Sequence, residues 1–172
     1  GFQSVNEAVQ KGTADVGFVN SGFGQVAEQQ GMVVALNVGE LAPDAVCCRQ
    51  TTSRKVLAEK RAALVKFQIA NLRASKLCME GKETAIKKLV NFSGQSEEYV
   101  DYCLYAEVMK ISMDPAKNRV DDFYKVMEAN GDIPEGADVW DVEKAVDSSI
   151  YEEALKEMKN RYPEDEKWTR LQ

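Results

Sequence analysis

The pattern of apolar and polar positions divides the chain into two regions. Up to residue 50, short apolar runs alternate with helical segments, and from residue 51 onward apolar residues recur at helical spacing. Three apolar runs, at residues 15–19, 32–38 and 45–50, predict strands. Because helical segments separate the first two, parallel strands buried on both faces are expected. The pattern therefore predicts an α/β fold, rich in helix, with a small and mainly parallel sheet.

Start and stop signals define the helices of the first region. Ser4 and Glu7 have the spacing of a capping box, and Gly12 is placed to end the helix that follows. Ser21 is expected to cap a second helix over residues 22–30. The turn between the first strand and this second helix is the focus of the functional prediction below.

The second region is predicted to be almost wholly helical. The expected helices cover residues 54–59, 61–80, 82–91, 96–106, 114–130 and 149–161. The longest carries two apolar stripes, which are Ala62, Val65, Ile69, Leu72 and Met79 on one side and Ala63, Phe67, Ala70, Ala74, Leu77 and Cys78 on the other. A helix with two such stripes is expected to pack from both sides.

Composition narrows the classes of function. With 172 residues, 44% hydrophobic and 29% charged, the chain is long enough for one core. Its net charge of −6 argues against a nucleic-acid partner, which favours a basic face. No apolar run approaches the roughly 20 residues that span a bilayer. Because Gly1 is not a natural start, we interpret the chain as a processed product or a fragment.

Residue types that carry catalysis or bind metals are scarce. The chain has no histidine, which is the commonest general base and metal ligand. Its cysteines, Cys47, Cys48, Cys78 and Cys103, form no C-x-x-C pair, and the adjacent Cys47 and Cys48 are interpreted as small buried hydrophobes. We therefore expect no metal, no cofactor and no catalytic residue.

The candidate ligand site lies at the ends of the predicted strands, where small ligands bind in open α/β sheets. The residues expected there are Asn20, Ser21, Gly22 and Phe23 after the first strand, and Asp44 and Cys47 beside the third. Backbone N–H groups at a helix start suit an anionic or polar group. The alternative is structural: Ser21 only caps a helix, Phe23 only fills the core, and Asp44 only forms a turn.

The order of these features resembles a known family. The runs EAVQKGTADVGFVNSGFGQVAEQQG and DAVCCRQTTSRKVLAEKRAALVKFQIANLRA, followed by MEANGDIP and VDSSIYEEALKE, are similar to exported solute-binding proteins of ABC importers. The group concerned handles nitrate, taurine, sulfonates and thiamine precursors. The resemblance covers the chain from about Val5 to about Tyr151 and rests on many weak features in order.

The resemblance implies the C-terminal portion of a two-lobed, type II periplasmic-binding-protein fold. Residues 1–50 would end the second lobe and return through the hinge, residues 51–162 would pack on the first lobe, and residues 163–172 would form a charged tail. The implied function is non-enzymatic capture of a small polar or anionic solute for a membrane permease. The implied location is the periplasm or the outer face of the cell membrane, with a lipid anchor in the second case.

Three further expectations remain open. Thiamine-pyrimidine synthases share this fold and would make the protein an enzyme, but they use histidine, which this chain lacks. A helical interaction module without a small ligand is the other alternative. In either case, a fragment with uncovered strand edges and apolar surface is expected to self-associate.

Overall fold

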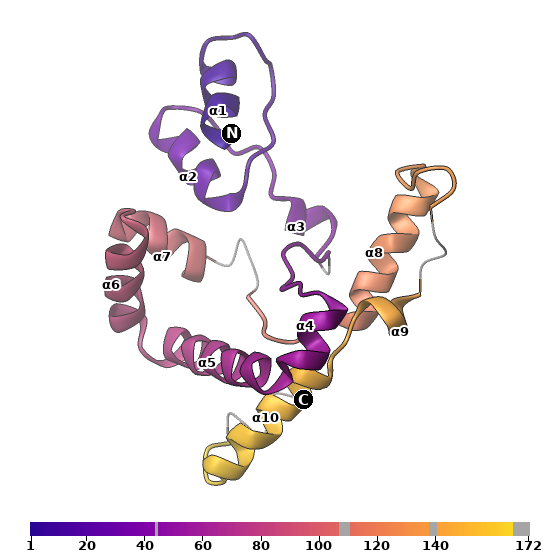
Figure 1. Ribbon diagram of the computed structural model, residues 1–172. Helices are drawn as coiled ribbons and strands as arrows, with labels where there is room; N and C mark the ends of the chain where they lie inside the picture. The colour runs from indigo at the N-terminus through magenta and orange to yellow at the C-terminus, as the bar shows by residue number, and fades with distance from the viewer. Residues whose placement is uncertain (44, 107–110, 138–140, 167–172) are drawn as a thin grey trace. The chain divides into compact units, whose positions relative to one another are not determined.

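The computed structural model describes residues 1–43, 45–106, 111–137 and 141–166, and the elements it contains there are helices (Figure 1). The first four are α1 (Phe2–Gln10), α2 (Ser21–Gln29), α3 (Val38–Leu41) and α4 (Arg54–Glu59). They are followed by α5 (Arg61–Glu80), α6 (Lys82–Ser93), α7 (Glu97–Tyr105), α8 (Lys117–Ala129), α9 (Val142–Ala145) and α10 (Ser149–Arg161).

The predicted α/β fold with a small parallel sheet is wrong, because no strand occurs among the described residues. The runs at 15–19, 32–37 and 45–50 are irregular, and residue 38 already belongs to α3. Val16, Phe18 and Val33 are 74%, 82% and 85% exposed, so these runs are not buried on two faces. A strand forms only when another segment pairs with its N–H and C=O groups, and a short apolar run does not supply that neighbour.

Most helices of the second region agree with the predictions, but α8 begins at Lys117 and not at residue 114. α4, α5 and α10 have the expected bounds, and Ser53 and Ser96 cap α4 and α7 through their hydroxyl oxygens. In the first region, Gly12 follows α1 with a φ of +69°, the left-handed conformation that glycine tolerates best. The Ser4–Glu7 capping box does not form, since α1 begins at Phe2 and Ser4 lies inside it.

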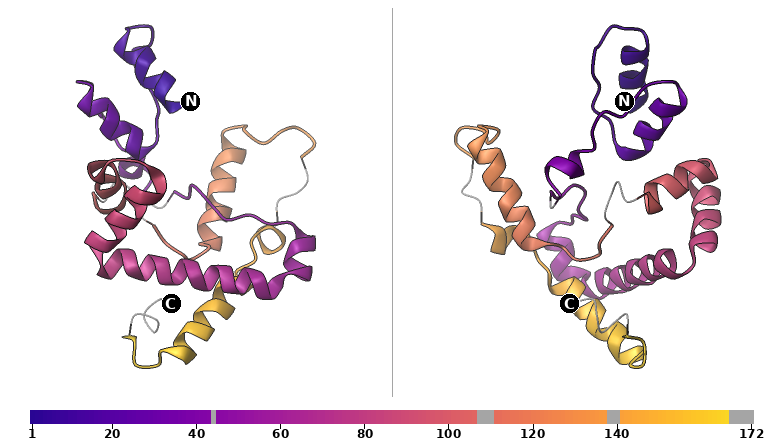
Figure 2. Two further views of the ribbon diagram at one scale, coloured as in Figure 1. Left: turned by 60° about the vertical axis from the view of Figure 1, so that its left-hand side comes forward. Right: turned by 180° about the vertical axis from the view of Figure 1, so that it is seen from behind.

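The chain forms two compact units, which are described separately. The first combines Gly1–Pro43 with Leu77–Ile111, and the second combines Asp44–Lys76 with Ser112–Gln172. Within the first unit, α2 packs against α1 and α7, and α6 packs against α7. Figure 2 shows α6 and α7 side by side in both views. The first unit is therefore a small helical cluster.

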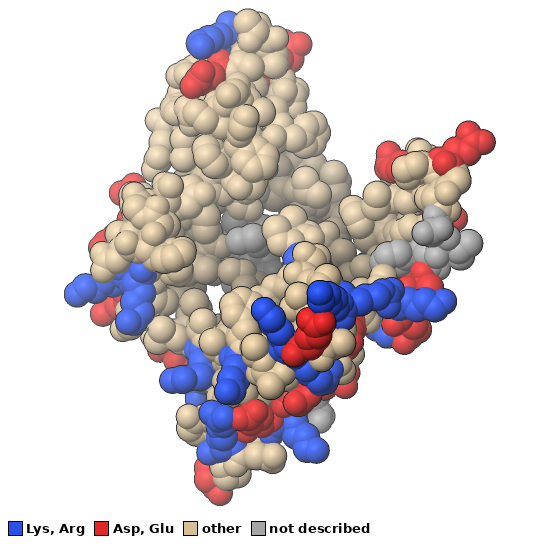
Figure 3. All heavy atoms as spheres, viewed as in Figure 1, with Lys and Arg blue, Asp and Glu red and all other residues tan. Residues whose placement is uncertain are grey.

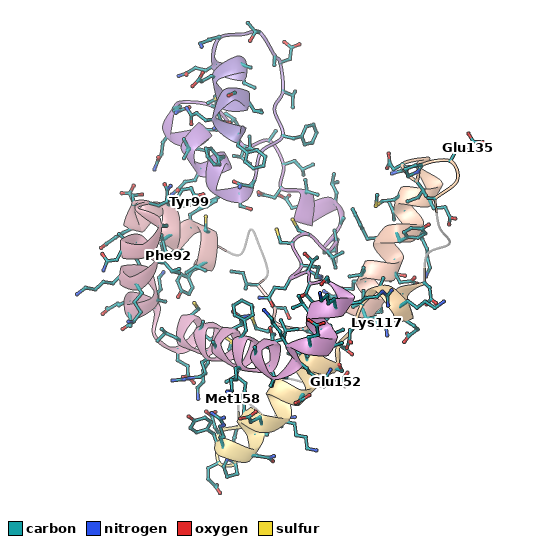
Figure 4. The ribbon with its side chains drawn as sticks, viewed as in Figure 1. Phe92, Tyr99, Lys117, Glu135, Glu152 and Met158 are labelled. Atoms are coloured by element: carbon teal, nitrogen blue, oxygen red, sulfur yellow. The ribbon has the colours of Figure 1, made fainter. Side chains whose placement is uncertain are left out.

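The core of the second unit lies between α5 and α10. Its buried side chains are Val65, Ile69 and Leu72 of α5 and Ala154, Leu155 and Met158 of α10. Leu72 and Met158, the latter labelled in Figure 4, are each 1% exposed. At the start of α5, Arg61 donates hydrogen bonds to Glu153 at 2.7 and 3.0 Å and to Ser149 at 3.0 Å. Apolar packing and these polar contacts together fix α10 on α5.

Only one of the two apolar stripes of α5 is buried, so the expectation that α5 packs from both sides is wrong. In the second stripe Ala63, Phe67, Ala70 and Ala74 are exposed, Phe67 to 56%, whereas Leu77 and Cys78 are half-buried. We call the four exposed residues the outer stripe of α5. Helical spacing places both stripes on α5, whereas the position of α10 determines which of them is covered.

Candidate functional site

The predicted ligand turn becomes the first turn of α2. Asn20 precedes the helix, and its Oδ1 accepts a hydrogen bond from the backbone N–H of Phe23 at 3.2 Å. Asn20 is therefore the N-cap, and Ser21 is the first helical residue instead of the cap that the sequence suggested. The Asn20 side-chain oxygen is occupied by this structural role.

The side chain of Tyr99 lies against Gly22 in this turn, a contact that the sequence did not predict. A Cβ built on Gly22 would lie 2.3 Å from the hydroxyl oxygen of Tyr99, so the phenol lies directly against the Gly22 backbone. Tyr99, labelled in Figure 4, comes from α7, which packs on α2. The only sequence signal was a glycine in the first turn of a helix, where a close approach is one reason for its presence.

Two backbone donors of the first turn have no acceptor. Within the described residues, the amides of Ser21 and Gly22 donate no hydrogen bond, whereas those of Phe23 and Gly24 bond to Asn20. The first turn of α2 contains no acidic residue. Because a helix N-terminus carries partial positive charge, this turn can receive an anionic or strongly polar group.

The Tyr99 hydroxyl adds a neutral donor. Burial raises the pKa of Tyr99, and the neighbouring Cys103 raises it further. Burial likewise raises the pKa of Cys103, although its hydrogen bond with Tyr99 acts in the opposite direction. Both groups therefore stay protonated at neutral pH. The phenol brings no negative charge to the turn, and its single O–H would have to turn from Cys103 to donate to a bound group.

Phe23 is half-buried and contacts α1 through its ring and its backbone. Its ring lies 5.7 Å from that of Phe2, with an interplanar angle of 45°. Its backbone oxygen accepts a hydrogen bond at 2.9 Å from Nδ2 of Asn6, which is only 3% exposed. Phe23 thus anchors α2 on α1.

The structure does not place the two remaining predicted site residues in the described part of the first unit. Asp44 lies outside the described residues, and Cys47 belongs to the second unit. Cys47 and Cys48 are exposed, so their interpretation as buried hydrophobes is wrong. Their Sγ atoms are 3.6 Å apart, and this thiol–thiol hydrogen bond is the main cause that raises the pKa of Cys48. Their adjacency in sequence, not the fold, explains the contact.

A separate open pocket of about 600 Å³ lies in the second unit, lined by residues of α8, α9 and α10 and of the loops before α8 and α10. Lys117 and Glu152, both labelled in Figure 4, lie on its wall. Lys117 pairs with Glu143, and burial together with the charge of Asp114 raises the pKa of Tyr151. Carboxylates outnumber cations here, so this pocket suits an anionic solute less well than the α2 turn.

The described part of the chain shows neither a candidate metal cluster nor a candidate membrane-spanning helix. It contains no cluster of three or more histidine, cysteine or carboxylate side chains that could hold a metal ion. None of its helices combines the length and apolar character that crossing a bilayer requires.

Comparison of the chain with family models, curated proteins and solved structures gave no match.

Proposed function

We propose that this chain is the solute-binding component of an ABC importer and captures a small polar or anionic solute outside the cell membrane for delivery to a membrane permease. The observation that carries the proposal is the first turn of α2, where the amides of Ser21 and Gly22 lack acceptors and the Tyr99 hydroxyl lies alongside. The resemblance of the residue order to importer solute-binding proteins supports the same function.

The chemistry of the turn favours a small oxyanion or sulfonate. Two backbone N–H groups, the Ser21 hydroxyl and the Tyr99 hydroxyl can donate hydrogen bonds, and residues 20–23 carry no charge of either sign. Such a site selects by hydrogen-bond geometry and helix polarity, without a fixed cation. Capture and release require only binding energy that differs between conformations and no catalytic group.

Isothermal titration with nitrate, sulfate and taurine tests this proposal, using the Tyr99→Phe variant. Removal of the hydroxyl should weaken binding of the preferred anion about tenfold, as loss of one hydrogen bond worth about 1–1.5 kcal/mol predicts. Tyr102→Phe on the same helix is the matched control and should bind like the parent. Equal affinities of the parent, Tyr99→Phe and Tyr102→Phe would exclude Tyr99 from the site. If the parent binds none of the three anions, the proposed function is refuted.

A helical protein-interaction module is the second candidate, favoured by the apolar surface of the first unit. Its most exposed large apolar side chains are Val16, Phe18, Val33, Leu41 and Phe92, which are 73–89% exposed. Soluble monomers rarely leave large contiguous apolar areas open to water. This surface supports association with another polypeptide, including a second copy of this chain.

A further inference from the structure

The outer stripe of α5 has the spacing of a helix-packing seam. Ala63, Phe67, Ala70 and Ala74 are separated alternately by four and three residues, the spacing of a and d positions in a heptad. They lie opposite Val65, Ile69 and Leu72, which face α10. Phe67 supplies a large side chain, whereas the alanines on either side let a partner backbone approach closely.

One edge of the outer stripe is basic. Lys66 and Arg73 are seven residues apart and lie on the same side of the stripe, and both are exposed. In the described part of the chain neither forms an ion pair or a side-chain hydrogen bond. Figure 3 shows Lys and Arg side chains low in the view, where α5 and α10 lie in Figure 1, together with Asp and Glu side chains. Lys66 and Arg73 therefore form no ion pair with a described residue, on a chain that is acidic overall.

We propose that the outer stripe of α5 docks a separate amphipathic helix with an apolar seam and acidic residues along the facing edge. Phe67 would fill a gap in the partner's seam, and Lys66 and Arg73 would pair with two carboxylates spaced about one heptad apart. The proposed solute site at α2 lies in the other unit.

A second copy of this chain is a poorer occupant of the same face. An antiparallel pairing of two α5 helices would bring the basic edges against each other, and like charges repel. A parallel pairing would set each basic edge against the opposite edge of the stripe, where Leu64, Asn71 and Cys78 carry no acid. Charge complementarity therefore favours a different, acidic partner.

The test measures binding of two designed helical peptides to the full chain by fluorescence anisotropy. Both peptides carry leucine and alanine at the seam, and their flanking positions hold glutamate in one and lysine in the other. We expect the glutamate peptide to bind at least tenfold more tightly at low salt, with the preference shrinking as salt is added. Absence of binding by the glutamate peptide, or equal binding of both peptides, would overturn the proposal.

Substitutions locate the binding face. Phe67→Ala should weaken the glutamate peptide about 30-fold, as truncation of a central aromatic does, whereas Phe92→Ala on α6 should leave binding unchanged. The double variant Lys66→Glu, Arg73→Glu should reverse the peptide preference, and Lys87→Glu with Lys88→Glu on α6 should not. If the α6 variants weaken binding as much as the α5 variants, the peptide binds elsewhere. If the parent chain dimerises and Phe67→Ala abolishes the dimer, a second copy occupies the face.

Discussion

Replacing Leu72 with alanine tests the packing of α5 against α10. The Leu72 side chain is 1% exposed and packs in the core of the second unit. Truncation removes three carbons from this core, a transfer loss of about 2.4 kcal/mol at about 0.8 kcal/mol per carbon. The cavity that remains adds to this loss, so the free energy of unfolding should fall by about 3–5 kcal/mol.

Phe67→Ala on the same helix is the matched comparison. The two-stripe pattern predicted that Phe67 lies on a packed face of α5, but the side chain is 56% exposed. Less than half of its apolar surface can be lost, which limits the cost to about 1.5 kcal/mol. The better helix propensity of alanine offsets part of that loss.

Urea unfolding followed by circular dichroism at the helical minimum measures both variants against the parent. Leu72→Ala should shift the midpoint strongly and leave the m-value unchanged, because the unfolded chain exposes nearly the same surface. The free energy of unfolding of an ordinary domain is about 5–15 kcal/mol, so the expected loss is a large fraction of it and the midpoint should shift accordingly. If Phe67→Ala costs as much as Leu72→Ala, α5 is packed on both sides and the burial described above is incorrect.

Three further measurements address the first unit and the pH dependence. Gly22→Ala should displace the Tyr99 phenol, which lies where the new Cβ would be, and should lower both the unfolding midpoint and anion affinity; unchanged values would place Tyr99 elsewhere. Hydrogen bonds from Ser149 lower the pKa of Asp147, so its carboxylate should stabilise the protein above about pH 4 and lose that effect as the pH falls through the lowered folded pKa. Asp147→Asn should accordingly be less stable than the parent at pH 7 and equally stable near pH 2 by thermal melting. Light scattering at high micromolar concentration should detect self-association, and a monomer there would contradict the role given to the exposed apolar surface.

Helices were predictable because their signals are local. Ser53 and Ser96 cap the helices that follow them, and α5 and α10 have the expected bounds. Each of these features depends on residues within a few positions of one another. At α2 the same reasoning chose Ser21 over Asn20, an error of one residue between two side chains that cap equally well.

The strands and part of the site were not predictable in this way. Val16, Phe18 and Val33 have strand propensity, but a sheet requires pairing with a segment that propensity does not specify. Tyr99 joins the α2 turn only because α7 packs on α2. The glycine at position 22 indicated that another group could approach the backbone closely, but not that this group is the Tyr99 side chain.

By itself, the amino-acid sequence determined the bounds of α4, α5 and α10, the overall negative charge and the absence of histidine. The tertiary structure decided which stripe of α5 is buried, because Val65, Ile69 and Leu72 meet α10 whereas Phe67 meets none of the described core. It also decided that the apolar runs of the first region stay irregular and that Tyr99 lies against Gly22. The physical reason is range: helical hydrogen bonds and caps join near neighbours, whereas burial and pairing depend on residues distant in the chain.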